Sequence, residues 1–328
     1  LDLLLLVPAG TPPHKDLPED TPSPEDRLAM TRLTADAMMM PDIVQVSNIE
    51  ISRKGKSYTA DTVEELHRQY PGAELYLLMG TDMFLSFQNW HDAKTIARLA
   101  GLCAFGRTEY GANVVTITLP GLVEISSTQL RQRLEKGAGG EDLLPAVYGY
   151  ILMHRLYGTH ADLKCLALPE LRACSYSMVR AKRVPHIRGT EEEAARLALR
   201  WGADETAARR AAVLHACTKY WTLEENLALC RRYHIQLDAI ERQTVKLLHA
   251  KTGACVAREV FGEPEEECQA IFWHTTGKAG MTTLEKVLYL ADYIEPTRDF
   301  DGLKELRMLA YEDLDQAVLM GFEMSIQE

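Results

Sequence analysis

Residues 75–82 read Leu-Tyr-Leu-Leu-Met-Gly-Thr-Asp, and this stretch decides the fold of the first half of the chain. Five apolar residues in a row predict a strand, and Gly80 follows it where a backbone can approach a ligand closely. Other short apolar or β-branched runs occupy 3–7, 43–46, 102–105 and 114–118. Helical patterns lie between them, at 61–70 and 129–136. This alternation predicts an α/β fold with a parallel sheet, whose ligands bind at the carboxyl ends of the strands.

The composition is that of an ordinary globular protein. The chain has 328 residues, of which 46% are apolar and 25% charged, and this length predicts two domains. A net charge of −11 argues against a general nucleic-acid binder. We expect no membrane span and no signal peptide, because the apolar run at 3–7 is too short for either. Seven scattered cysteines without C-x-x-C spacing predict free thiols in a reducing cytoplasm.

The character of the sequence changes after Gly158. From about Ser175 onward there is hardly a strand signal, and long amphipathic runs are separated by short Gly- or Pro-containing breaks. This pattern predicts an all-α second half. We therefore expect one domain at 1–158, a linker at 159–169 and a second domain at 170–328.

Two stretches of the first half suit a phosphate. Residues 7–15 (Val-Pro-Ala-Gly-Thr-Pro-Pro-His-Lys) form a stiff loop after a strand and carry His14 and Lys15 at its tip; a plain surface loop is equally consistent with them. Residues 125–131 (Ile-Ser-Ser-Thr-Gln-Leu-Arg) place hydroxyls where a helix begins and N–H groups point outward. Arg131 lies three residues beyond Thr128 and shares its helix face. Ordinary N-capping by serine or threonine explains the second stretch equally well.

A third pattern suits a nucleoside. Asp82 follows the strand end at Gly80 and could accept hydrogen bonds from ribose hydroxyls. Trp90, eight residues later, could stack on an aromatic ring, although a core tryptophan is the simpler interpretation of that residue alone. A second hydroxyl-rich entry into a helix lies at 55–62, which includes Thr59.

Taken together, these motifs resemble bacterial nicotinate-nucleotide adenylyltransferases over nearly all of residues 1–157. The resemblance rests on Val-Pro-Ala-Gly-x-Pro-Pro-His-Lys at 7–15, Arg27-Leu28-x-Met30, Ser57-Tyr58-Thr59, Gly80-x-Asp82, Trp90 and the stretch at 125–131. It implies adenylyl transfer from ATP to nicotinate mononucleotide with Mg²⁺ on the phosphates. It also implies that Thr59 and Trp90 hold the nicotinate end and Asp82 a ribose. The ATP phosphates would be held by Ser126, Ser127, Thr128 and Arg131, with His14 and Lys15 near the reacting groups.

One part of that family's pattern has no counterpart in this sequence. The family opens with a strand, a Gly-Gly-Thr-Phe-x-Pro-x-His loop and a Gly-His pair, whereas Leu1 already stands at the second strand. We therefore expect the whole protein to carry further residues before Leu1. If Leu1 were the natural start, we would expect this half not to catalyse.

In the second half, four histidines and one aspartate end apolar runs on separate helical segments. They are His186, His215, His249, His274 and Asp292. A single histidine on a helix is usually structural, but several polar groups directed at one core are costly unless they bind something. Imidazole and carboxylate together suit Fe, Mn or Zn.

This half resembles HD-domain phosphohydrolases, and more closely the bacterial branch that splits diadenosine tetraphosphate symmetrically into two ADP. The matching words are Tyr176-Ser177-Met178-Val179, Lys182-Arg183, Leu214-His215 with Lys219, Gly253-Ala254, residues 274–277 and 280–286, and Ala291-Asp292-Tyr293-Ile294-Glu295-Pro296 with Arg298. The resemblance implies two divalent metals, iron foremost, on the four histidines and Asp292. Phosphate contacts would come from Lys219, Thr275, Thr276 and Arg298, with Lys219 taking part in catalysis.

The aspartate that follows histidine in the family's name-giving pair is replaced by Ala216. A methyl group binds no metal, and every other ligand is present, so we interpret Ala216 as a deliberate change that stops hydrolysis. The sequence as a whole predicts a bifunctional cytoplasmic enzyme acting on ATP, nicotinate mononucleotide and diadenosine tetraphosphate. The alternative is a non-catalytic nucleotide-binding or scaffolding protein. The sequence does not decide whether the chain forms a homo-oligomer.

Overall fold

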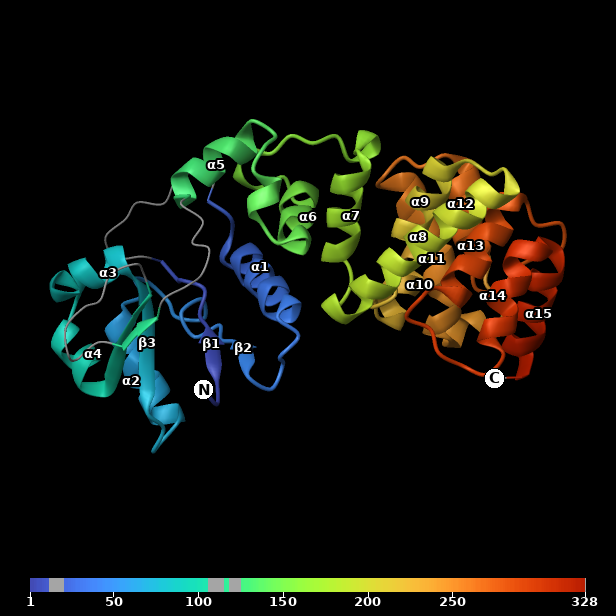
Figure 1. The fold of residues 1–328 in the computed structure, drawn as a ribbon. Helices are drawn as coiled ribbons and strands as arrows, with labels where there is room; N and C mark the ends of the chain where they lie inside the picture. Colours follow the sequence, from blue (N-terminus) through green and yellow to red (C-terminus); the bar gives the residue numbers. More distant parts are fainter. Residues whose placement is uncertain (12–20, 106–114, 118–124, 328) are drawn as a thin grey trace. The chain divides into compact units, whose positions relative to one another are not determined.

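The computed structural model describes residues 1–11, 21–105, 115–117 and 125–327 (Figure 1). The chain forms two compact units, one made of Leu1–Ala35 with Met40–Gln132 and the other of Asp36–Met39 with Arg133–Glu328. The first mixes strands and helices, and in the described part of the second the regular elements are all helices. The expected α/β first half and all-α second half are both confirmed.

The first unit contains two parallel sheets. β1 (Leu4–Leu6) pairs with β2 (Val44–Val46), and β3 (Leu75–Gly80) pairs with β4 (Ala100–Phe105), which in turn pairs with β5 (Val115–Ile117). Parallel pairing is as predicted, but the described strands form two sheets instead of one. In the larger sheet Gly80 lies opposite Phe105, so β3 and β4 end together at one edge.

The described helices of residues 1–135 surround the strands, and α3 and α4 pack directly on the larger sheet. The helices are α1 (Pro24–Ala37), α2 (Thr59–Gln69), α3 (Thr81–Ser86), the 3-10 helix η1 (Phe87–Asn89), α4 (Ala93–Leu99) and α5 (Ser127–Glu135). The buried residues Val63, Met79, Phe87 and Ile96 pack together, and α2 lies against α4. This packing holds the starts of α2 and α3 close to the strand ends.

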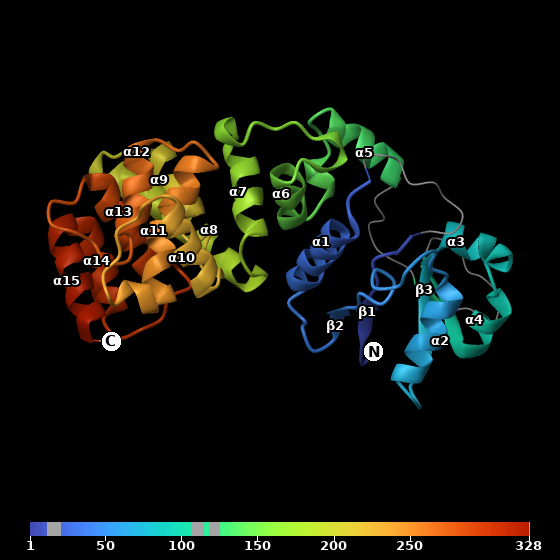
Figure 2. The same cartoon turned by 180° about the vertical axis from the view of Figure 1, so that it is seen from behind.

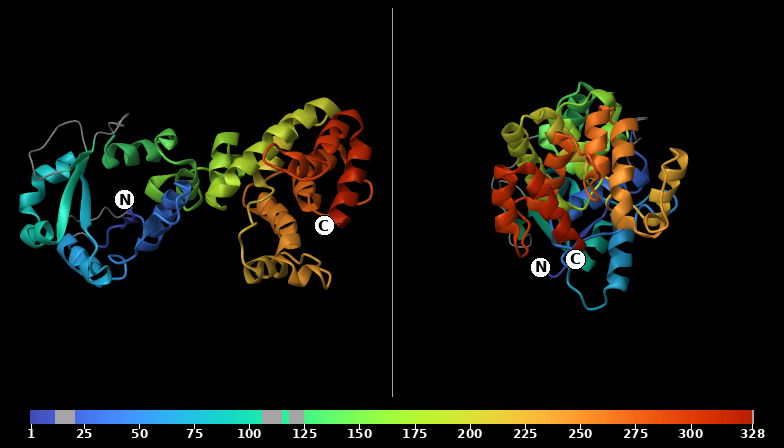
Figure 3. Two further views of the ribbon diagram at one scale, coloured as in Figure 1. Left: turned by 60° about the horizontal axis from the view of Figure 1, so that its bottom comes forward. Right: turned by 90° about the vertical axis from the view of Figure 1, so that its right-hand side faces the viewer.

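The second unit is a helical bundle. Its α-helices are α6 (Pro145–Met153), α7 (Leu168–Ser177), α8 (Val184–Trp201), α9 (Glu205–Leu214), α10 (Leu223–Arg232), α11 (Val245–Glu259), α12 (Glu265–Trp273), α13 (Thr283–Ile294), α14 (Leu303–Glu312) and α15 (Leu314–Gln327). α8 and α9 pack together, α12 packs on α9 and α13, and α13 packs on α8, with α11 beside α12 (Figure 2). α14 and α15 close the bundle against α13 (Figure 3).

Local sequence signals explain where several helices begin and end. Asp204 caps α9, and Thr222 and Thr282 each form a capping box with the glutamate three residues later. Gly202 ends α8 with φ of 73°, a left-handed conformation that glycine adopts without steric cost. These signals fix the helices that carry the polar residues of the bundle core.

The segment expected to link the domains instead packs within the helical unit. Leu166 is buried in the main helical core, and Asp162 caps a short 3-10 helix at Leu163–Cys165. In the division by contacts, the second unit takes up the chain again at Arg133. All seven cysteines are free, and six of them are buried. Within the described residues, we find no helix with the length and apolar character needed to cross a membrane.

Candidate functional site

The carboxyl ends of β3 and β4 form the first candidate site. The Thr81 hydroxyl donates to the Phe105 carbonyl over 3.2 Å and ties the two strand ends together. Asp82 lies in the first turn of α3, and its side chain is exposed. A Cβ on residue 80 would lie 2.8 Å from Asp82 Oδ1, so only glycine lets this carboxylate lie against the strand end. Asp82 therefore stands where parallel sheets bind their ligands.

Thr59 and Trp90 come from segments that lie side by side. Thr59 begins α2, Trp90 follows η1, and both side chains are half-buried. The rings of their chain neighbours Tyr58 and His91 have centroids 4.2 Å apart. Trp90 also packs beside Phe87, with ring centroids 5.6 Å apart. Trp90 thus stands at the border of the core, where core packing and contact with a ligand are both compatible with its position.

The start of α5 is a capped helix end with exposed hydroxyls. The Ser126 amide donates to Gln129 Oε1 over 2.9 Å, and the Gln129 amide donates to Ser126 Oγ over 3.2 Å. The N-capping interpretation of Ser126 therefore holds. Ser127 and Thr128 are exposed, and Arg131 on the next turn is half-buried. A ligand at this helix end would meet the first-turn amides without disturbing the capping box.

The loop after β1 is held by Arg27, whose motif is visible in the sequence, and by Glu50, which no motif indicated. Arg27 donates to the Ala9 carbonyl over 2.5 Å, and the Gly10 amide donates to Glu50 Oε2 over 3.1 Å. Glu50 Oε1 accepts from the Thr62 hydroxyl, which joins this loop to the start of α2. Glu50 is forty residues from Gly10, so no local pattern reveals the contact. His14 and Lys15 lie outside the described residues.

Five predicted metal ligands meet in the helical unit. His186 lies on α8, His215 follows α9, His249 lies on α11, His274 follows α12 and Asp292 lies on α13. The four imidazole rings follow one another in the order His186, His215, His274, His249, and successive ring centroids lie 5.2, 5.2 and 5.0 Å apart. The structure therefore brings together all five residues.

Each imidazole is oriented by a partner on its Nδ1 atom. In His215, His249 and His274 this atom lies 2.6 Å from the backbone carbonyl three residues earlier. In His186 it lies 2.9 Å from Glu295 Oε1. A carbonyl or carboxylate only accepts, so each Nδ1 carries the proton and each Nε2 is left with its lone pair. Histidine ligands of metals are oriented in this way.

The Nε2 atoms face other acceptors at short range. His186 Nε2 lies 3.1 Å from His215 Nε2 and 3.0 Å from Asp292 Oδ1, and His249 Nε2 lies 3.2 Å from His274 Nε2. Lone pairs at these distances repel unless a cation lies among them. The donor set of imidazole nitrogens and a carboxylate oxygen fits a first-row divalent metal.

Burial sets the protonation states that such a site needs. It lowers the pKa of His215 and His249 well below the usual value and that of His274 below it. Burial alone would raise the pKa of Asp292, but the hydrogen bond to His186, the neighbouring imidazoles and Arg298 hold it well below its usual range. Neutral imidazoles and an ionised carboxylate are the forms that bind metal.

The predicted phosphate contacts fall into two groups. Arg298 donates to Asp292 Oδ1 over 2.9 Å, so it lies directly beside a metal ligand. Burial and the charge of Arg183 lower the pKa of Lys219 to about 8. Thr275 Oγ1 is buried without a hydrogen-bond partner among the described residues, whereas Thr276 is exposed. Lys219 and Arg298 are thus placed close to Asp292, and Thr275 holds an unused hydroxyl.

Comparison with known proteins finds two families in one chain. Residues 1–133 match the cytidylyltransferase-like family, and residues 183–297 match the HD domain. The symmetrical bis(5'-nucleosyl)-tetraphosphatase of Bacillus subtilis (strain 168) is 39% identical over 155 residues, which cover 47% of this chain and 83% of that protein. A probable nicotinate-nucleotide adenylyltransferase of Synechococcus sp. (strain JA-2-3B'a(2-13)) is 36% identical over 171 residues, which cover 48% of this chain and 83% of that protein. This chain belongs to both families.

A crystal structure of a "predicted HD superfamily hydrolase involved in NAD metabolism" from Clostridium acetobutylicum shares 36% identity. The match covers 49% of this chain and 86% of the Clostridium acetobutylicum chain, with a TM-score of 0.48. On the family evidence, the chain is a nucleotidyltransferase enzyme joined to an HD hydrolase domain, with nucleotide substrates and a divalent metal in the HD domain.

The HD domain carries Ala216 directly after His215, where the family's pattern has an aspartate. Ala216 is fully buried and packs with Tyr176, Val179 and Ile187. Among the described residues, Asp292 is the carboxylate that faces the Nε2 atoms of His186 and His215. The HD domain also contains two site residues that sequence reasoning did not assign, Glu295 and Arg183. Arg183 Nε is buried without a hydrogen-bond partner among the described residues, and burial lowers the pKa of this arginine.

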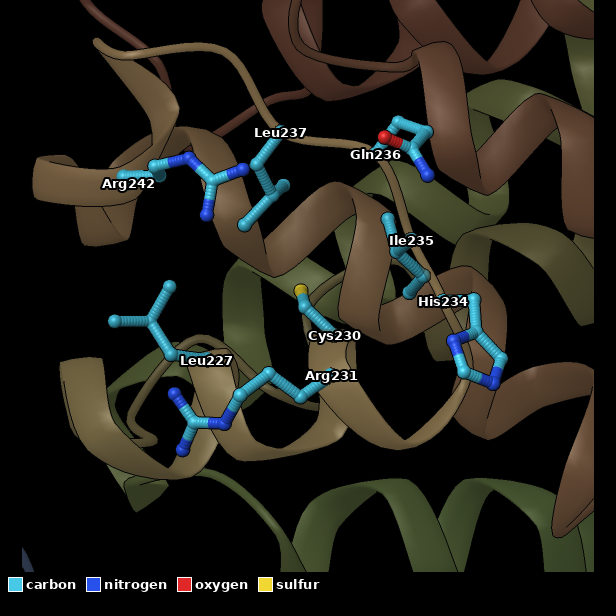
Figure 4. A pocket seen from close by; sticks show the side chains of 8 residues that line it. All are labelled: Leu227, Cys230, Arg231, His234, Ile235, Gln236, Leu237 and Arg242. Atoms are coloured by element: carbon cyan, nitrogen blue, oxygen red, sulfur yellow. The ribbon is translucent and has the colours of Figure 1, made fainter.

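A separate pocket of about 380 Å³ lies at α10 and the segment that follows it (Figure 4). Its lining combines aliphatic side chains, a buried thiol and two arginines, and includes none of the five predicted metal ligands. The lining residues are Leu227, Cys230, Arg231, His234, Ile235, Gln236, Leu237 and Arg242.

Proposed function

We propose that the first part of the chain transfers an adenylyl group from ATP to nicotinate mononucleotide. In this reaction a phosphate oxygen of the mononucleotide attacks the α-phosphorus of ATP, and the bond to pyrophosphate breaks. Relatives named as probable nicotinate-nucleotide adenylyltransferases support the proposal, as does the position of Asp82 at the sheet edge.

The roles in this reaction are mainly those of positioning and charge stabilisation. Thr59 and Trp90 hold the nicotinate end, and Asp82 accepts from a ribose hydroxyl. The ATP phosphates lie at the start of α5, against Ser127, Thr128 and Arg131, with Ser126 ordering the first turn through its capping box. Mg²⁺ neutralises the phosphates, and His14 and Lys15 act near the reacting groups.

For the HD domain we propose symmetrical hydrolysis of diadenosine tetraphosphate to two ADP. The convergence of four Nε2 lone pairs and Asp292 is the observation that carries this proposal. These five residues would hold divalent metal, with iron as the proposed ion, which supplies Lewis-acid activation of water and of the scissile phosphate. Lys219, Arg298 and Thr275 bind the polyphosphate chain, and Thr276 contacts it from the exposed side.

We further propose that Ala216 greatly slows this hydrolysis while leaving nucleotide binding in place. The charged and hydroxyl groups proposed for phosphate binding do not involve residue 216. This combination also favours the second candidate function, in which the HD domain binds dinucleotides without turning them over.

The two activities are tested separately on the purified chain. Pyrophosphate release is followed with ATP, nicotinate mononucleotide and Mg²⁺, and ADP release is followed with diadenosine tetraphosphate and Fe²⁺ or Mn²⁺. We expect slow ADP release that Ala216→Asp raises strongly. If the dinucleotide binds but neither form releases ADP, the HD domain is a binding module.

A further inference from the structure

The four histidines of the HD domain differ in the group that accepts from the Nδ1 atom, behind each imidazole. Behind His215, His249 and His274 the Nδ1 partner is a neutral backbone carbonyl. Behind His186 it is the carboxylate of Glu295. A carboxylate partner makes imidazole a stronger metal ligand than a carbonyl does. The four histidines are therefore not equivalent donors.

Glu295 is built into its position. Its side chain is fully buried, and it accepts from the Thr297 amide over 2.7 Å and from the Thr297 hydroxyl over 2.6 Å. Together with His186 Nδ1, three donors address this one carboxylate. Because each donor requires a negatively polarised oxygen, the surroundings fix both the place and the charge of Glu295.

Gly189 on α8 makes room for this carboxylate. A Cβ on residue 189 would lie 2.5 Å from Glu295 Oε2 and 3.1 Å from Pro296 Cδ. Glycine inside a helix destabilises it relative to alanine. Its presence one turn after His186 is explained by the close approach of Glu295.

Charge and geometry place the stronger metal-binding subsite at the end of the centre that holds His186 and Glu295. His186, His215 and Asp292 offer ligand atoms within 4.8 Å of one another, and they form the one such group of three among the described residues. With alanine at position 216, the His249–His274 pair has two imidazoles and no carboxylate of its own at this range. One end thus carries two carboxylates, Asp292 and Glu295, with Arg298 beside both, and the search of the described residues places no carboxylate ligand at the other end.

We infer that divalent ions bind the two ends of this metal centre one after the other, the stronger subsite first. The first divalent ion binds His186, His215 and Asp292, and Glu295 is the positioning residue that strengthens this subsite. A second ion at His249 and His274 binds much more weakly. This inference rests on the proposed metal-dependent function, and it concerns which end binds metal rather than which substrate is cleaved.

The test is a titration of the metal-free chain with Co²⁺ or Mn²⁺, followed by calorimetry and, for Co²⁺, by visible absorption. We expect one tight site, which Glu295→Gln weakens by about 10–100-fold. The matched control is Glu263→Gln, because Glu263 is also fully buried and pairs with Arg210 away from the histidines. The control should leave the metal affinity unchanged even where it lowers the melting temperature.

Histidine variants keep the inference testable if Glu295→Gln does not fold. His186→Ala should abolish the tight site, whereas His249→Ala should leave it. Equal loss in both variants, or an unchanged affinity in folded Glu295→Gln, would overturn the inference. A tight site that behaves as expected in a protein without hydrolytic activity, even as Ala216→Asp, would overturn the proposed hydrolysis and leave the order of filling intact.

Discussion

Replacing Ala216 by aspartate tests the proposed origin of slow hydrolysis most directly. Ala216 is fully buried among Tyr176, Val179 and Ile187, so an aspartate there would be surrounded by mainly apolar side chains when metal is absent. An uncompensated buried charge costs about 3–5 kcal/mol. We therefore expect the metal-free Ala216→Asp variant to melt at a lower temperature than the unaltered chain, by several degrees.

When metal is bound, the aspartate of Ala216→Asp should stabilise the folded chain instead of destabilising it. One carboxylate about 4 Å from a divalent ion gains roughly 8 kcal/mol of Coulomb energy at an effective dielectric constant of about 20. Desolvation removes several kcal/mol of that gain. The remainder of about 3 kcal/mol corresponds to roughly 150-fold tighter binding of the second ion.

The assay measures metal content and ADP release from diadenosine tetraphosphate with added Mn²⁺ or Fe²⁺. Ala216→Asn is the matched control, because it adds nearly the same volume without a charge. We expect the aspartate variant to bind a second ion and to hydrolyse at least about 100-fold faster, and the asparagine variant to do neither. If the unaltered chain is as fast as Ala216→Asp, or if asparagine restores activity equally, the two-metal reasoning is wrong.

The remaining predictions concern three other side chains. Trp90→Ala should raise the KM for nicotinate mononucleotide more than the KM for ATP, since lost stacking costs about 1–3 kcal/mol; equal effects on both substrates would exclude Trp90 from the nicotinate end. Arg131→Lys should recover little of the activity lost in Arg131→Ala, because lysine lacks the planar two-pronged donor group; full activity of the lysine variant would show that only charge matters there. Because the pKa of Lys219 falls to about 8 in the folded chain, the unfolded chain binds more protons between pH 8 and 10.5, and stability should rise with pH across this window. Lys219→Met should therefore stabilise the metal-free chain at pH 7, by at most about 3 kcal/mol, and much less at pH 10.5; equal gains in denaturant unfolding at both pH values would contradict the burial of a charged lysine.

The positions of most elements could be predicted because they depend on local signals. The strand expected at 75–79 spans Leu75–Gly80, and the helix expected at 61–70 spans Thr59–Gln69. Short apolar runs and helical periodicity suffice for this. The burial of Leu166 could not be predicted in the same way, because this residue becomes part of the core only through contacts with distant helices.

The candidate metal ligands could be predicted, but their supporting partners could not. His215 and Asp292 end apolar runs that are visible in the sequence. Glu295 also lies in a motif that the sequence displays, yet its role depends on His186, which is 109 residues away, and on the missing side chain of Gly189. No local pattern relates these three residues, because the contact exists only where α8 and α13 pack together.

The charge balance around the HD site gives a reason why lost turnover and retained binding can coexist. Arg183, Lys219 and Arg298 lie near enough to Asp292 to act on one another electrostatically, and among the described residues the carboxylates of Asp292 and Glu295 act against them. Because the imidazoles are neutral, this neighbourhood carries excess positive charge before any metal binds, and each divalent ion adds to it. Removing a carboxylate at position 216 weakens the hold on a second cation and, by the same electrostatics, strengthens the attraction for a polyphosphate. Metal and polyphosphate should therefore support each other's binding even in a site that turns over slowly.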